Sequence, residues 1–263
     1  YQGHGDIYPT GKNPYNTEHT PGGSTGGGAA ALAAGFTTLE LGADLGGSVR
    51  VPSSFCGLYG LKPTEKTVPL HGNVPLPKNA HTFIVHMVQA GPLARSLDDL
   101  EVLWRTIVGP HESDRNIPDI NWRPAAKDGL SEYKIAWTDG WPDFQTSGPV
   151  SSAIGKIAAK LKENGCDVEK RIPDETLHRE SLENWVGTFP YVVAQGLPWY
   201  VRALFKQQLN SSLLKGVRSE MPEIARAMSR GFKLHANHYG EMMLNRSMIV
   251  ERWERFFGEY DFL

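Results

Sequence analysis

Two serines in the first fifty residues have a setting that suits nucleophilic chemistry. Ser24 and Ser48 each directly follow a pair of glycines. Glycine permits backbone conformations that are closed to other residues, and successive N–H groups in such a loop can converge on one anion. If Ser48 attacks a carbonyl carbon, the negative oxygen would develop at this point, where one donor is worth about 3–4 kcal/mol in the transition state. The candidate oxyanion donors are the N–H groups of Leu45, Gly46, Gly47 and Ser48.

A serine hydroxyl needs a base before it can attack. Between Ser24 and Ser48 the chain has no histidine or lysine, and Glu40 is the only glutamate. Asp44 is close in sequence, but a carboxylate in such a loop more often orients backbone than takes a proton. The segment has neither the Gly-Lys-Ser/Thr ending of a phosphate loop nor a G-x-S-x-G elbow. The residues alone therefore leave a catalytic Ser48 and an ordinary glycine-rich turn equally open.

The whole run from residue 21 to residue 64 resembles the signature segment of the amidase signature family of serine hydrolases. Weaker similarity extends to residues 13–16 and 90–96. The blocks that carry the resemblance are Gly-Gly-Ser-Thr-Gly-Gly at 22–27, Gly-Gly-Ser-Val-Arg at 46–50, Phe-Cys-Gly at 55–57 and Gly-Leu-Lys-Pro-Thr at 60–64.

The resemblance implies a triad of serine, cis-serine and lysine. Ser48 matches the nucleophile, and Ser24 matches the bridging serine, whose peptide bond from Gly23 is cis in the family. The hydroxyl of Ser24 would pass a proton between Ser48 and a neutral lysine. Thr25, Asp44 and Arg50 match supporting positions, and we expect Arg50 to pair with Asp44. The resemblance implies no cofactor and no metal.

The chain departs from the family pattern at the base. The family's lysine lies well upstream of the bridging serine, so we expect it before this chain begins. Lys12 is too close to Ser24 in sequence, and Lys62 matches a position that we interpret as structural. Ala43 replaces the family's usual threonine, for which we expect a small effect.

Three functions stay in consideration. The first is a stand-alone amidase that hydrolyses a small-molecule carboxylic amide, and some esters, through an acyl-enzyme on Ser48. The second is an amidotransferase subunit, although that relative commonly has glutamine where this chain has Val51. The third is a non-catalytic scaffold or binding module that lost the lysine. We prefer the first, and we expect the 263-residue chain alone to be inactive.

The composition limits the partners. The chain has 263 residues, 27 basic and 29 acidic, for a net charge of −2, so we expect neither nucleic acid nor a membrane as a partner. A homo-oligomer stays open. The two cysteines, Cys56 and Cys166, exclude a disulfide framework and favour a reducing, cytoplasmic compartment. Both ends of the chain resemble cut points, so we expect a piece of a longer protein.

The elements around the serines follow from local patterns. We predict a helix of small residues over 26–34 with Gly35 after its end, a strand over 37–41, and a loop over 42–48. Ser96 should cap a helix that runs to about residue 108.

The later elements suggest a parallel crossover. We predict a strand over 133–137, an amphipathic helix over 150–163 and a second strand over 166–172. Helices broken at Pro190, Pro198 and Pro222 should follow. The predicted fold class is α/β, a mixed β-sheet core covered by helices on both faces, within a single amidase signature domain spanning residues 1–263. Loops over 66–90 and the helical region over 177–257 would set substrate specificity.

Overall fold

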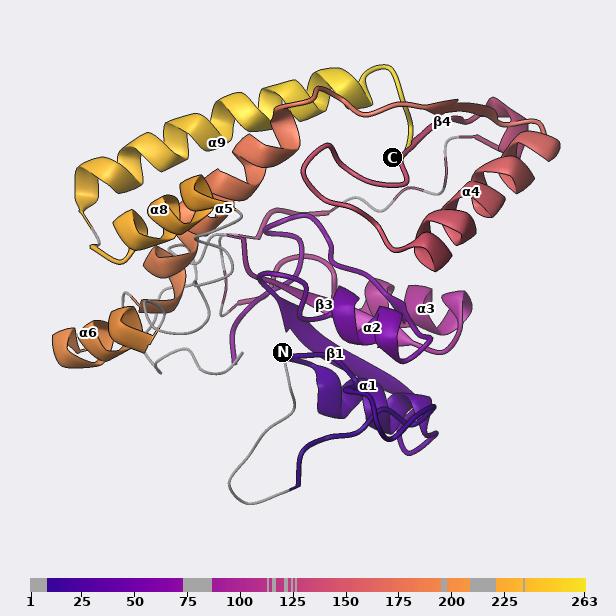
Figure 1. Cartoon of the computed structure of the whole chain (residues 1–263). Helices are drawn as coiled ribbons and strands as arrows, with labels where there is room; N and C mark the ends of the chain where they lie inside the picture. Colours follow the sequence, from indigo (N-terminus) through magenta and orange to yellow (C-terminus); the bar gives the residue numbers. More distant parts are fainter. Residues whose placement is uncertain are drawn as a thin grey trace. The chain divides into compact units, whose positions relative to one another are not determined.

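The computed structural model describes residues 9–72, 87–112, 114, 117–120, 123, 125, 127–194, 198–208, 221–233 and 235–263. These residues form two compact units, Tyr1–Trp122 and Arg123–Leu263. Figure 1 colours the chain from indigo in the first unit to yellow at the end of the second. Each unit is described by itself.

The first unit is built on a three-stranded sheet in the order β1-β3-β2. Its central strand β3 (Gln89–Ala94) pairs antiparallel with β1 (Leu39–Asp44) on one side and with β2 (Tyr59–Gly60) on the other. All six residues of β3 are buried. The sheet therefore joins the segment before Ser48 to the segment after it.

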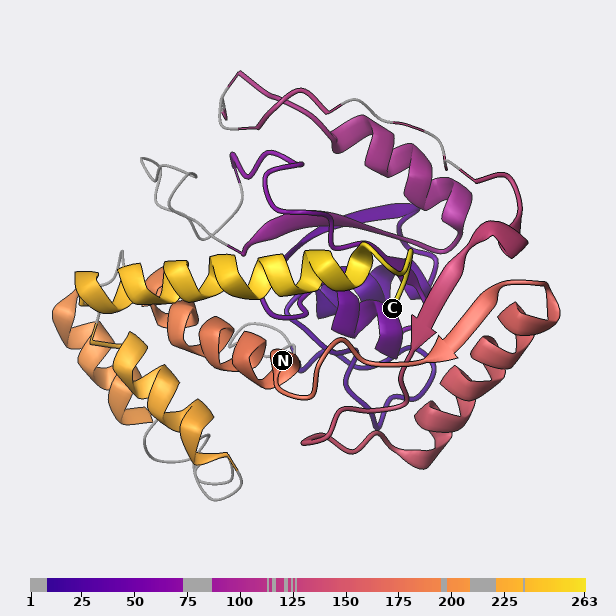
Figure 2. The ribbon, with the colours of Figure 1, turned by 90° about the horizontal axis from the view of Figure 1, so that it is seen from above.

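Helices cover both faces of this sheet. Figure 2 shows α3 (Leu97–Ile107) on one side of it, with α1 (Gly26–Ala33) and α2 (Arg50–Phe55) on the other. The core between α1, α2 and β3 consists of fully buried small and aliphatic side chains. These are Ala29, Leu32, Val49, Cys56 and Leu93.

The predicted helix of small residues is confirmed as α1, and Gly35 follows it with a φ of +79°. The small residues allow α1 to approach β1 closely. A Cβ added at Gly28 would lie 2.6 Å from Cδ of Glu40 in β1. The predicted cap of the next helix is also confirmed, since Ser96 Oγ accepts a hydrogen bond from the N–H of Asp99 at 3.1 Å.

The predicted boundary between strand and loop was wrong by several residues. Residues 42–44 were assigned to a loop, but they belong to β1, which starts at Leu39. They pair with Gln89, Ala90 and Gly91 of β3, far along the chain. This pairing supplies the backbone partners that the local glycine-rich sequence does not indicate.

The second unit contains the predicted parallel crossover. Strand β4 (Lys134–Trp137) is followed by α4 (Gly148–Glu163) and by β5 (Asp167–Lys170), which pairs parallel to β4. A short 3-10 helix, Leu130–Glu132, precedes β4. The end of the chain lies on the other edge of β4, where Ala136 N–H donates to the carbonyl of Phe262 at 2.9 Å.

The rest of this unit is helical, with α5 (Leu177–Ala194), α6 (Trp199–Gln208), α8 (Pro222–Gly231) and α9 (Ala236–Phe257). The prediction of a break at Pro190 was wrong, because Pro190 lies inside α5. Pro190 is buried and faces Gly231 of α8, where an added Cβ would lie 2.9 Å from the proline ring. This tertiary contact overrides the usual cost of an interior proline. Pro198 and Pro222 do stand at helix starts, as predicted.

The strands and helices of the two units confirm the α/β class. In the described residues no helix is long and apolar enough to cross a membrane. Within the loop region expected to set specificity, residues 73–86 lie outside the described residues. The assignment of residues 1–263 to one domain stays a prediction.

Gly91 in β3 should be required for the fold of the first unit. An alanine Cβ there would lie 2.1 Å from the carbonyl oxygen of Leu61, a backbone atom that cannot rotate away. We expect Gly91→Ala to lower the free energy of unfolding by about 2–3 kcal/mol in urea titrations.

Gly27→Ala is the matched control. Gly27 is exposed in α1, and an added Cβ meets nothing within 4 Å. Alanine there should raise stability by about 0.5–1 kcal/mol. If Gly91→Ala and Gly27→Ala changed the free energy of unfolding equally, the result would contradict the requirement for glycine at position 91 of β3.

Candidate active site

The loop that carries Ser48 is organised around one buried carboxylate. Asp44, the last residue of β1, has no exposed surface. Its Oδ1 accepts a hydrogen bond from the N–H of Gly47 at 2.7 Å. Its Oδ2 accepts from the N–H of Val49 at 3.1 Å and from that of Arg50 at 3.3 Å. Asp44 therefore holds the backbone on both sides of Ser48 in place.

The Arg50 side chain binds the same carboxylate with two groups. Its Nε donates to Oδ2 of Asp44 at 3.0 Å, and its Nη2 donates to Oδ1 at 2.9 Å. Burial by itself would raise the pKa of Asp44. The Arg50 side chain and the N–H groups of Gly47 and Val49 outweigh burial and lower that pKa to about 2. The predicted Asp44–Arg50 pair is confirmed, and Asp44 acts on the backbone, as expected.

Gly47 is required by the shape of this loop. Its φ is +105°, and an added Cβ would lie 2.9 Å from Cγ2 of Val51. In this structure its N–H donates to Asp44. The assignment of the N–H groups of Leu45, Gly46, Gly47 and Ser48 as oxyanion donors stays a prediction.

The two serine segments lie side by side. The N–H of Thr25 donates to the carbonyl of Ser48 at 3.1 Å. The peptide bond between Gly23 and Ser24 is cis, as the resemblance implies. Ser48 is buried, with 9% of its surface exposed, whereas Ser24 is exposed. In the described part of the chain the hydroxyl groups of Ser24 and Ser48 make no hydrogen bond with each other.

Thr25 occupies the N-cap position of α1, although its side chain makes no capping hydrogen bond. Its side chain fills the space next to β1 instead. A Cβ added at Gly42 would lie 2.5 Å from Oγ1 of Thr25. Thr25 therefore supports the site by packing.

Within the described residues no lysine donates a hydrogen bond to Ser24 or Ser48. Lys62, interpreted as structural, donates from Nζ to the carbonyl of Pro63 at 3.0 Å. Cys56 is buried in the core next to this site, and burial raises the pKa of its thiol. A second nucleophile at Cys56 is therefore disfavoured, in line with its expected role as a small apolar residue.

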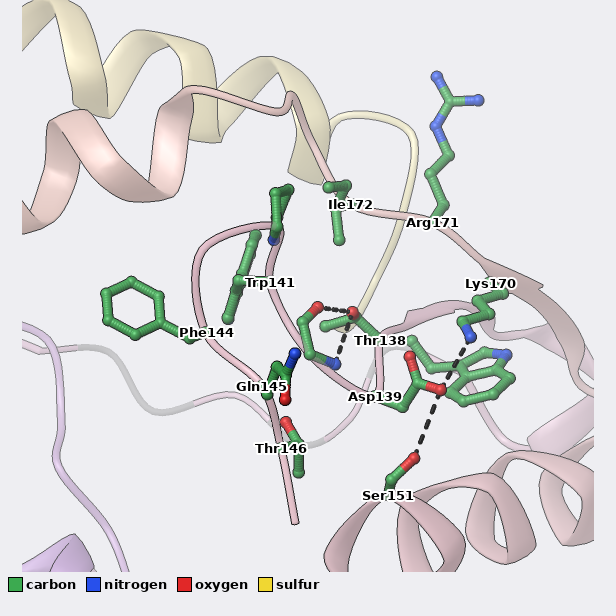
Figure 3. Close-up of a pocket in the computed structure, with 13 residues that line it drawn as sticks. Thr138, Asp139, Trp141, Phe144, Gln145, Thr146, Ser151, Lys170, Arg171 and Ile172 are labelled. Carbon is green, nitrogen blue, oxygen red and sulfur yellow. Dashed lines mark hydrogen bonds and ion pairs between the residues drawn. The ribbon is translucent and has the colours of Figure 1, made fainter. Parts of the chain in front are cut away.

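The second unit holds a cavity that the sequence did not indicate. It has a volume of about 660 Å³ and lies where β4 and β5 end (Figure 3). Its walls come from residues 137–142 and 144–146, from residues 170–172 and from Ser151 of α4.

Comparisons with known proteins identify the family. The family model described as Amidase matches residues 1–263. A glutamyl-tRNA(Gln) amidotransferase subunit from Sulfolobus acidocaldarius is 30% identical over 96% of this chain and 54% of its own length. The corresponding protein from a Synechococcus strain is 46% identical over 60% of this chain and 31% of its own. The chain thus spans about half the length of relatives that it matches along most of its own sequence.

Solved structures share the fold. The glutamyl-tRNA(Gln) amidotransferase subunit of Thermotoga maritima superposes with a TM-score of 0.71 at 24% identity, covering 97% of this chain and 52% of that one. A bacterial aryl acylamidase of the amidase signature family superposes with a TM-score of 0.67 at 20% identity, covering 95% and 49%. The predicted amidase signature fold is confirmed.

The pKa of Asp44 predicts how stability depends on pH. Because the folded pKa of about 2 lies below the ordinary 3.8, the ionised carboxylate stabilises the fold fully above pH 3.8. This contribution is lost as the pH falls toward the folded pKa. At about pH 6 we expect the free energy of unfolding of Asp44→Asn to be lower than that of the wild type by about 2 kcal/mol or more.

The free energy of unfolding of both proteins, measured from about pH 6 down to about pH 2.5, checks this expectation. The difference in free energy of unfolding between the wild type and Asp44→Asn should become smaller at the acid end of this range. Asp98→Asn, at an exposed position in α3, serves as the control and should show no such convergence. If the free energy of unfolding of Asp44→Asn stayed below that of the wild type by a constant amount across this range, the result would contradict the lowered pKa of Asp44.

Proposed function

The chain belongs to the amidase family, and we propose that it hydrolyses a carboxylic amide through an acyl-enzyme on Ser48. One observation carries the proposal. The loop fixed by Asp44 sets a buried Ser48 beside the cis Gly23–Ser24 bond, with the N–H of Thr25 on the carbonyl of Ser48. An ordinary glycine-rich turn would not need a fully buried carboxylate that binds the backbone on both sides of a serine.

In the proposed reaction Ser48 Oγ attacks the amide carbon as Ser24 takes its proton. Ser24 passes a proton to a neutral lysine, which the resemblance to the family leads us to expect outside these 263 residues. The same relay returns a proton to the nitrogen, the C–N bond breaks, and the amine or ammonia leaves. Water then attacks the ester of Ser48, and the carboxylic acid is released. An amine is a poor leaving group unless it is protonated, so the relay matters more for amides than for esters, some of which should also react.

The oxyanion would be held by the N–H groups of Leu45, Gly46 and Ser48. The N–H of Gly47 donates to the Asp44 carboxylate, and this hydrogen bond stabilises the loop.

An amidotransferase subunit is the second candidate. The relatives that bear this name, one of them 30% identical over 96% of this chain, favour it. Both candidates share the acyl-enzyme step on Ser48 and differ in the fate of the nitrogen. A stand-alone amidase releases ammonia or an amine by itself and needs no protein partner, whereas an amidotransferase component would depend on others. Val51, where that relative commonly has glutamine, keeps the stand-alone amidase as our preference.

We also propose a cytoplasmic setting. Both cysteines of the chain, Cys56 and Cys166, are free and buried. Unpaired thiols suit a reducing compartment.

Ser48→Ala should abolish covalent labelling. A fluorophosphonate reacts only with an activated serine, so a longer protein that supplies the lysine should gain one adduct, mapped to Ser48 by mass spectrometry. The Ser48→Ala variant should gain none, and its amide turnover should fall by roughly 10⁴-fold or more.

Ser54→Ala is the matched control, since Ser54 is exposed on the neighbouring helix α2. It should keep both labelling and turnover. Full turnover by Ser48→Ala, or an adduct mapped elsewhere, would reject the proposed nucleophile. Absence of any adduct in the lysine-containing protein would favour the non-catalytic alternative.

The 263-residue chain alone should neither react with the probe nor hydrolyse amides, because we expect the lysine that serves as base to lie outside these 263 residues. Intact mass before and after the probe measures this directly. Amide hydrolysis by the chain alone would show that no external lysine is needed.

A further inference from the structure

Asn13 is a buried residue that binds two segments lying far apart in the sequence. Only 6% of its surface is exposed. Its Nδ2 donates to the carbonyl of Phe55 at 2.8 Å and to the carbonyl of Thr20 at 3.4 Å. Phe55 is the last residue of α2 and stands 42 positions after Asn13. One side chain therefore joins the segment before Ser24 to the helix after Ser48.

The backbone around Asn13 is itself held by hydrogen bonds. The N–H of Tyr15 donates to Oδ1 of Asn13 at 3.0 Å. The N–H of Asn13 donates to the carbonyl of His19 at 2.9 Å, and its carbonyl accepts from the N–H of Asn16 at 3.2 Å. Because its amide side chain and both of its backbone groups are bound, Asn13 is a fixed point for the residues that follow.

The chain then lies against α2 on its way to the first serine. Thr20 Oγ1 accepts a hydrogen bond from the N–H of Gly22 at 3.1 Å. Cys56, directly after α2, donates from Sγ to the carbonyl of Pro21 at 3.6 Å. A Cβ added at Gly22 would lie 3.1 Å from Cα of Pro52 in α2. The path of residues 20–22 is thus determined by contacts with one helix.

Ser24 is the first exposed residue after this buried stretch. Its position relative to Ser48 depends on both segments. Asp44 holds the backbone around Ser48, and α2 begins at Arg50. The contacts of Asn13 hold the segment before Ser24 to that same helix. A displacement of about 1 Å between reacting groups can cost a factor of about 100 in rate, so this tie bears on any proton transfer between the two hydroxyls.

We propose that Asn13 is a positioning residue for the proton relay between Ser48 and Ser24. The proposal rests on the function proposed above for Ser48. Asn13 neither touches the substrate nor exchanges a proton. It acts through Thr20 and Phe55, whose carbonyls it binds, and so sets where the backbone that carries Ser24 lies.

The choice of substrate separates this role from a purely structural one. A departing amine must be protonated through the relay, whereas a phenolate leaves an ester without that proton. A displaced Ser24 should therefore slow the hydrolysis of an amide more than that of an ester with the same acyl group. A protein that is only less stable loses the two activities by the same factor, because the fraction of folded molecules is the same for both.

The test uses a longer protein that supplies the lysine, with p-nitroacetanilide and p-nitrophenyl acetate as the matched amide and ester. We expect Asn13→Ala to lower kcat for the amide by about tenfold or more and kcat for the ester by at most about threefold. KM for either substrate should stay unchanged, since Asn13 does not contact substrate. An equal fall in kcat for the amide and the ester would overturn the proposal.

Asn16→Ala is the matched control. Asn16 is exposed in the same segment, and its Oδ1 accepts from the N–H of Glu18 at 3.0 Å. This variant should keep both activities. A fall in the amide-to-ester ratio as large as that of Asn13→Ala would show that the tie to α2 is not what matters, and would reject the role of Asn13.

A milder pair of variants covers the case in which Asn13→Ala does not fold, which far-UV circular dichroism would show. Thr20→Val keeps the shape of the side chain but removes the oxygen that accepts from Gly22. It should lower the amide-to-ester ratio, and Thr20→Ser, which keeps the hydroxyl, should restore it. A ratio that stays at the wild-type value in every folded variant would overturn the proposal.

Failure of this role can be told apart from failure of the proposed function. Absence of amide hydrolysis by the wild type, or full turnover by Ser48→Ala, would reject the proposed function and the role of Asn13 with it. Amide hydrolysis that depends on Ser48, combined with equal losses for amide and ester in Asn13→Ala, would reject the role of Asn13 alone.

Discussion

The first unit depends on the burial of one charge. Asp44 has no exposed surface, so its carboxylate must be satisfied by the protein. Three backbone N–H groups and the Arg50 side chain do this, and every one of them belongs to residues 47–50. The end of β1, the serine loop and the start of α2 are thereby one rigid piece. The conformation of Ser48 follows from where its neighbours must be to reach Asp44.

Close approach of backbones is the second constraint. The helix α1 can lie on β1 because its residues are small, and Thr25 can sit beside β1 because residue 42 is a glycine. This packing brings the start of α1 to the serine loop, where Thr25 donates to the carbonyl of Ser48. Small residues therefore do more here than permit turns, since they allow α1 and Thr25 to lie close to β1.

Much of this arrangement could be predicted from the sequence, because its signals are local. The helix of small residues, the Ser96 cap, the parallel crossover and the Asp44–Arg50 pair all come from residues close together in the chain. The errors involve partners that are distant in sequence. Residues 42–44 became a strand through β3, and Pro190 stayed helical through Gly231. In the second unit Trp141 stacks on His178, a contact that no local sequence pattern predicts.

The position of Arg50 also bears on how a negative charge could develop beside Ser48. An isolated buried carboxylate next to a nucleophile would oppose the formation of an oxyanion, since like charges repel strongly where water is excluded. Arg50 places a guanidinium on that carboxylate, with two hydrogen bonds of 2.9 and 3.0 Å. The pair is neutral as a whole, so Asp44 can organise the loop without raising the barrier to attack. For this reason we assign Arg50 a positioning and neutralising role in the proposed reaction. Contact with substrate is not needed to explain why an arginine follows the serine loop.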